Sequence, residues 1–196
     1  MPVLRLPQGE LRDEIRQPIY DTITITAPES VVGERRFFSS VQGKPLSQTN
    51  LRQNNLLEVA VSFRIQGLAF DAQNSVAANA GVLPVLLENS SITLQVGEKQ
   101  YWQGPILYLG GRLSAFYALA GSSTAERAYQ RFGELAVAPV QYSGRHTIDI
   151  NPLQSFYSKW VVDSLDASDL AAATLAPGSK MRFQFSLKGT LRRPVQ

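Results

Sequence analysis

The stretch "LLEVAVSFRIQGLAF", residues 56–70, alternates apolar and polar side chains more regularly than the rest of the chain. Four apolar residues fall on one face and mostly polar residues on the other: Val59, Val61, Phe63 and Ile65 against Glu58, Ala60, Ser62 and Arg64. A period of two places alternate side chains on opposite faces of an extended chain. The stretch therefore predicts a central β-strand with one buried face.

Similar patterns on both sides of this strand predict more strands and few helices. Strands are expected at 21–27, at 31–38, in a hairpin over 90–109, on both sides of Pro152 within 144–162, and at 180–193. Short helical segments are expected within 71–89, 125–132 and 164–179. Because no strand–helix–strand rhythm is present, a parallel α/β sheet is disfavoured. We expect an all-β antiparallel β-sandwich, a single jelly roll of about eight strands with short helices in the loops. It spans residues 21–196 and follows an irregular N-terminal arm, residues 1–20.

Composition limits the possible classes of protein. The chain has 196 residues, of which 44% are hydrophobic, enough for one core. It has no cysteine, which excludes disulfides, thiolate metal sites and cysteine nucleophiles. The first 18 residues lack the apolar core of a secretory signal. No apolar run reaches the roughly 18 to 20 residues that a membrane-spanning helix needs.

Positive charge gathers near the end of the chain. The net charge is +3, yet residues 170–196 alone carry +5, from Lys180, Arg182, Lys188, Arg192 and Arg193. Such a cluster favours a face turned toward an anionic partner, nucleic acid or lipid headgroups. The alternative is an ordinary surface strand whose polar positions are lysine and arginine. Arg35 and Arg36 precede two phenylalanines, a pairing used for single-stranded nucleic acid; the alternative places the rings in the core and the arginines near an edge.

Catalytic chemistry finds little support. His146 is the only histidine, so a metal site built from several histidines and a carboxylate is excluded. No serine lies in a nucleophile elbow, and no pattern pairs two carboxylates. We therefore expect no catalytic residue, no metal and no cofactor. Tyr101 and Trp102 suggest sugar stacking, but adjacent strand positions face opposite ways, so we favour a cross-strand aromatic pair.

Three segments carry a resemblance to a known family. They are "RRFFSSVQGKPLSQTNLRQNNLLEVAVSFRIQGLAF" at 35–70, "LLENSSITLQVGEKQYWQGPILYLGG" at 86–111 and "LKGTLRRPVQ" at 187–196. In this order they resemble the single jelly-roll capsid proteins of icosahedral bacteriophages of the internal-membrane or small-genome type. The resemblance implies a structural shell protein, not an enzyme, found in the virion and assembled in the host cytoplasm. Its partners would be copies of itself and other capsid proteins.

The resemblance also implies that the chain ends reach neighbours, an internal lipid membrane or nucleic acid. We expect five residues to contact such partners: Lys188, Arg192, Arg193, Arg35 and Arg36. Pro194 cannot donate to a strand ladder and would end the sheet. The chain lacks the long arginine-rich arm of many genome-packaging capsid proteins. The alternatives are a glycan- or receptor-binding β-sandwich of a phage spike or tail, a lipid-surface protein and, least favoured, a jelly-roll enzyme.

Overall fold

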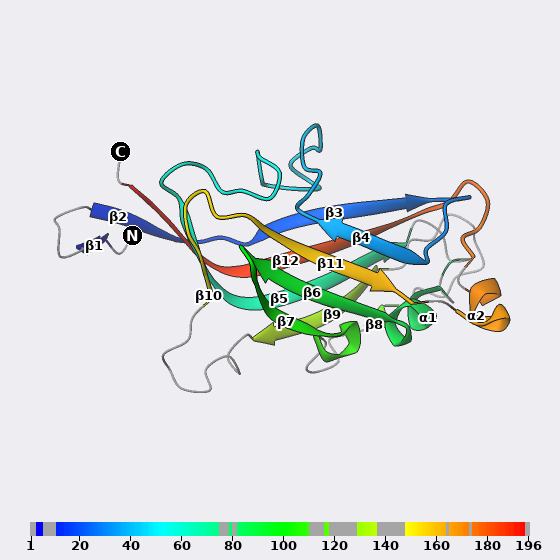
Figure 1. The fold of residues 1–196 in the computed structure, drawn as a ribbon. Helices are drawn as coiled ribbons and strands as arrows, with labels where there is room; N and C mark the ends of the chain where they lie inside the picture. Colours follow the sequence, from blue (N-terminus) through cyan, green and yellow to red (C-terminus); the bar gives the residue numbers. More distant parts are fainter. Residues whose placement is uncertain are drawn as a thin grey trace.

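Two antiparallel β-sheets pack face to face in the computed structural model (Figure 1). The structure describes residues 3–5, 11–74, 79, 82–109, 116–117, 129–136, 148–163, 165–172 and 174–194. Among these residues, no helix is long and apolar enough to cross a membrane.

In the part of the chain that the structure describes, eight strands make up the sandwich. They are β3 (Ile19–Thr26), β4 (Gly33–Phe37), β5 (Ser62–Asn74), β6 (Ser90–Val96), β7 (Lys99–Pro105), β9 (Tyr129–Ala136), β11 (Phe156–Val162) and β12 (Lys180–Pro194). In the first sheet the order is β3-β12-β5-β9, and in the second it is β4-β11-β6-β7. Successive strands thus cross repeatedly between the sheets, which is the double Greek key of a jelly roll. The predicted fold class is confirmed.

Shorter elements extend the first sheet and occupy the loops. The added strands are β1 (Val3–Arg5), β2 (Leu11–Arg16), β8 (Phe116–Tyr117) and β10 (Ile148–Ile150). The short helices expected within 71–89 and 164–179 are present as α1 (Val82–Glu88) and α2 (Ala167–Ala172), and an additional 3-10 helix, η2 (Ile106–Leu109), ends the segment that was predicted as a hairpin.

The expectations for the N-terminal arm and for residues 125–132 differ from the structure. Residues 11–16 form β2 where we expected an irregular arm, because β12 extends to Pro194 and offers them a strand to pair with. The helix expected over 125–132 is wrong where the structure describes it, since β9 begins at Tyr129 and pairs with β5. Residues 125–128 lie outside the described part.

An aromatic cluster fills the space between the sheets. β11 and β12 alternate buried and partly exposed residues, and their buried faces meet at Trp160 and Phe183, whose ring centres are 4.7 Å apart. Phe37 and Phe70 pack edge to face beside them. Each fully buried aromatic ring contributes about 1.5–3 kcal/mol to folding. The cluster therefore holds the two sheets together.

The backbone ladder of the first sheet is irregular at one level on several neighbouring strands. We call the line through these positions, which runs across the strands, the break line. Relative to β12, β5 has one extra residue, Gln66. Before it, the side chains that point into the core are Phe63 and Ile65. After it, the inward positions are displaced by one residue and resume at Leu68. Opposite this bulge, Gly189 of β12 comes so close that a Cβ there would lie 1.9 Å from the carbonyl oxygen of Arg64. Only glycine permits this approach.

On the other side of β12, the break line continues at Gln17 and Pro18. β2 continues β3 in unbroken register, because Ile19 pairs with Leu187 and Arg16 with Thr190. Pro18 has no N–H to give to the ladder, so the strand is interrupted there.

The central strand itself starts later than predicted. β5 begins at Ser62, and Val59 is 73% exposed instead of buried. Val61 donates its N–H to the carbonyl of Glu58, and Ala60 has a φ of 64°, so a turn replaces the first third of the predicted strand.

Candidate functional site

Both ends of the described chain meet beyond the break line. We call this region the terminal sheet: β1, β2, residues 190–194 of β12, residues 62–65 of β5, and β10. Figure 1 shows β1, β2 and the end of β12 reaching past the rest of the sandwich. Projecting strands of this kind are accessible to other molecules.

A charged row crosses the outer face of the terminal sheet. Register places Arg16, Thr190, Arg64 and Asp149 side by side on four neighbouring strands. Arg64 donates to both carboxylate oxygens of Asp149, at 2.9 and 3.3 Å. This hydrogen bond raises the pKa of Arg64 above its ordinary value, outweighing the partial burial that lowers it; Glu14 acts in the same direction. The row ties β5 to β10.

A second charged pair lies two residues further along the same face. The Nε atom of Arg192 donates to Oε1 of Glu14 at 2.6 Å, and both side chains are only about a quarter exposed. Charge-assisted hydrogen bonds this short are among the stronger ones in proteins. On the opposite face Arg193 lies 3.9 Å from Asp13, with a more exposed side chain.

The outer face of the terminal sheet keeps a surplus of positive charge. Among the described side chains, Arg16, Arg64 and Arg192 share it with two carboxylates, Glu14 and Asp149. Arg16 is exposed and makes no ion pair within the described part of the chain. Lys188 lies on the same face, one residue before Gly189, and already has a partner within the chain. This face suits carboxylates or phosphates of a partner.

The structure separates the five residues singled out from the sequence. Lys188, Arg192 and Arg193 lie at or beyond the break line, whereas Arg35 and Arg36 lie on β4 of the other sheet.

Arg35 and Arg36 both serve contacts within the chain. Arg35 points inward and donates to the backbone oxygens of Ser30 and Val31 and to Glu29. Its guanidinium also lies 6.0 Å from the ring centre of Trp160. Arg36 points outward, pairs with Glu34 at 2.9 Å and covers Tyr157. Arg35 therefore holds the loop between β3 and β4.

Sequence reasoning missed the acidic half of the terminal sheet. None of the residues Asp13, Glu14, Asp149, Arg16 and Arg64 is among the five contact residues predicted from the sequence. A signal was present, because "LRDEIR" at 11–16 places two acidic residues where the antiparallel "LRRP" at 191–194 places two basic ones. Opposite charges on paired strands favour one register.

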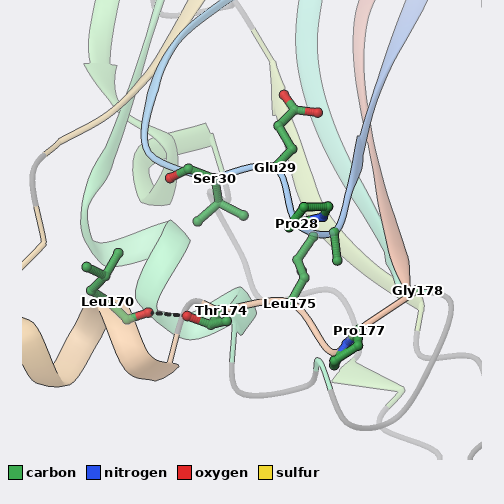
Figure 2. A pocket seen from close by; sticks show the side chains of 10 residues that line it. Pro28, Glu29, Ser30, Leu170, Thr174, Leu175, Pro177 and Gly178 are labelled. Carbon is green, nitrogen blue, oxygen red and sulfur yellow. Dashed lines mark hydrogen bonds between the residues drawn. The ribbon is translucent and has the colours of Figure 1, made fainter.

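A pocket lies at the far end of the sandwich (Figure 2). It measures about 530 Å³ and lies between the β3–β4 loop and the loop carrying α2. Its polar groups bond within the chain: Thr174 donates to the carbonyl of Leu170 at 2.9 Å, and Glu29 pairs with Arg35. The remaining wall is mostly apolar, formed by Ala27, Pro28, Val31, Leu170, Leu175 and Pro177. Among the described residues that line it, no nucleophile is paired with a base.

The buried acidic residue Asp21 has a structural role. Its side chain is fully buried, accepts the N–H of Phe38 at 2.7 Å and pairs with Lys44 at 2.7 Å. Within the described residues, no three His, Cys, Asp or Glu side chains gather in a way that would hold a metal ion. His146 lies outside the described residues.

Comparison with known proteins adds no relative. No protein-family model matches the chain, and no curated protein matches it significantly in sequence. The fold and the terminal sheet therefore carry the functional argument alone.

Proposed function

We propose that this chain is a structural subunit of a virion shell and that copies of the chain assemble with one another to form the shell. Jelly rolls of this strand order serve as capsid, lectin and cupin domains. The fold therefore limits the function to a few classes but does not select one of them. The observation that favours a shell subunit is the terminal sheet. Both chain ends leave the sandwich together there and present a cationic outer face to the surroundings.

The chemistry of this surface suits a neighbouring copy. Arg16 would take a carboxylate from the next subunit, while Arg192 is already engaged with Glu14 and holds the end of β12 to β2. A surplus of a few charges mainly orients two subunits as they approach and raises the rate of their association. It adds less to the affinity. Phosphates of a lipid headgroup or of nucleic acid would bind the same cations, which the experiment below separates from self-contact.

The test is the mass of the purified chain in solution. Light scattering after size exclusion should give discrete oligomers or closed shells, and negative-stain microscopy of the same fractions should show their form. Arg16→Ala should lower the assembled fraction. Arg52→Ala, which removes an exposed charge from the loop between β4 and β5, outside the terminal sheet, should not.

Three outcomes decide the proposal. Assembly that depends on Arg16 without any additive supports self-contact. Assembly only with anionic vesicles or with DNA identifies a phosphate partner instead. A monomer at every concentration and ionic strength, with or without these additions, contradicts the proposal.

A second candidate, glycan binding, rests on the hairpin of β6 and β7. Tyr101 is 37% exposed, beside Gln100 and Gln103, which hydrogen-bond each other at 2.6 Å. The cross-strand aromatic pair that we expected is absent, because Trp102 lies opposite Leu94. A tyrosine next to planar amides can stack on a sugar ring. Quenching of tryptophan fluorescence by oligosaccharides, lost in Tyr101→Ala, would support this candidate.

A further inference from the structure

The two N-terminal strands, β1 and β2, are called the arm from here on. Along the chain, a single short link connects the arm to the sandwich. β1 pairs with β2, and β2 pairs with residues 190–194 of β12. The link from β2 to β3 is Gln17 and Pro18, both exposed. Because proline interrupts the ladder there, β2 is not a continuous extension of β3. The pairing of β2 with β12 is what holds the arm in place.

The body of the protein is clamped just after this link. Asn50 donates to the carbonyl of Pro18 at 2.7 Å and accepts the N–H of Tyr20 at 3.1 Å. Thr49 donates to the carbonyl of Tyr20 at 3.0 Å. These bonds fix the chain from Pro18 onward to the loop between β4 and β5. The boundary between a fixed body and a separable arm therefore falls at Gln17.

The contacts of the arm are ones that a second copy supplies equally well. They comprise a backbone ladder to residues 190–194, the Glu14–Arg192 pair and the Asp13–Arg193 pair. Exchange of an identical element between copies keeps every such contact and requires a change only at the link. A two-stranded ribbon such as β1 and β2 is also only marginally stable alone in water.

We propose that the assembled protein exchanges its arms: residues 11–16 of one copy pair with residues 190–194 of a neighbouring copy. This inference rests on the proposed self-assembly and names the segment that joins the subunits. Arg192 and Arg193 then pair with the neighbour's Glu14 and Asp13. The exchange links each subunit to the next through a strand ladder.

Single-cysteine variants test the exchange, because the chain has no cysteine of its own. Glu14→Cys and Arg192→Cys chains are co-expressed, assembled, oxidised and analysed by mass spectrometry and a non-reducing gel. Asp13→Cys with Arg193→Cys forms a second set. Facing positions alternate between wide and narrow spacing in antiparallel strands, so one of the two sets suits a disulfide.

The controls separate exchange from collision and from failure of the register. To measure cross-linking by random collision, Arg52→Cys, at a highly exposed position, replaces Arg192→Cys as the partner of Glu14→Cys. The double variant E14C/R192C in one chain, kept dilute, should close on itself and show that the register is correct.

The expected result is a shift of the mixed variants from one-chain to two-chain mass, absent in the Arg52→Cys control. Assembled particles that show no cross-link between the mixed chains would overturn the exchange and leave the proposed function standing. A chain that never assembles, and that closes only on itself, would overturn both.

Discussion

Replacing Gly189 by alanine tests the break line. The added Cβ would lie 1.9 Å from the carbonyl oxygen of Arg64 and 2.9 Å from Cζ of Phe63. The nearest atom belongs to the backbone of a paired strand, so no side-chain rotation relieves the clash. Overpacking in a core costs 1–3 kcal/mol, and a backbone obstruction places this change at the upper end, about 3 kcal/mol.

Urea unfolding followed by tryptophan fluorescence measures this cost, since Trp160 is buried in the core. With a urea slope of about 1–3 kcal/mol per molar, the midpoint should fall by about 1–3 M. Gly43→Ala is the matched control. Its Cβ meets nothing within 4 Å, but its φ of +80° strains the backbone by about 1 kcal/mol. If Gly189→Ala unfolded within about 0.5 kcal/mol of the parent chain, the close approach of β12 to β5 would be refuted.

Three further predictions concern polar contacts. Asp21→Ala should lower the unfolding free energy by about 3–5 kcal/mol, because the N–H of Phe38 and the ammonium of Lys44 lose their partner. Asp21→Asn keeps an acceptor and should lose less; equal losses would contradict the bond to Phe38. A double-mutant cycle on Arg64→Ala and Asp149→Ala should give a coupling of about 0.5–1 kcal/mol, since both side chains are about one-third exposed. Zero coupling would mean that the pair does not form in solution. Added salt should reduce the assembled fraction in light scattering, as it screens exposed charges beyond about 10 Å at 0.1 M; assembly indifferent to salt would rule out a charged contact.

Local patterns in the sequence were sufficient for the strands of the sandwich. The alternation at 180–193 became β12, with Phe183 and Phe185 inward, and the hairpin over 90–109 became β6 and β7. These strands are half-buried, so the period of two in the sequence corresponds directly to one buried face. Pro152 marked the interruption between β10 and β11 for the same local reason.

Features that depend on distant partners could not be predicted. Val59 continues the alternation of β5, yet a turn removes it from the strand. Tyr129 begins a strand in a stretch of helix-forming residues because β5 offers an unpaired edge. The meeting of Glu14 with Arg192 requires a register across 178 positions of sequence, which no local pattern encodes. The terminal sheet is therefore a property of the folded chain.

The break line has a mechanical meaning. Pro18, Gln66 and Gly189 lie on three adjacent strands at the same level, where the ladder is interrupted or bulged. Ladder hydrogen bonds are interrupted or displaced along this line, so fewer regular backbone contacts join the terminal sheet to the rest of the first sheet than join the strands inside either part. Under the proposed function, the break line is the place where the terminal sheet would tilt against the sandwich, so that copies meeting at unequal angles keep the contacts inside each part.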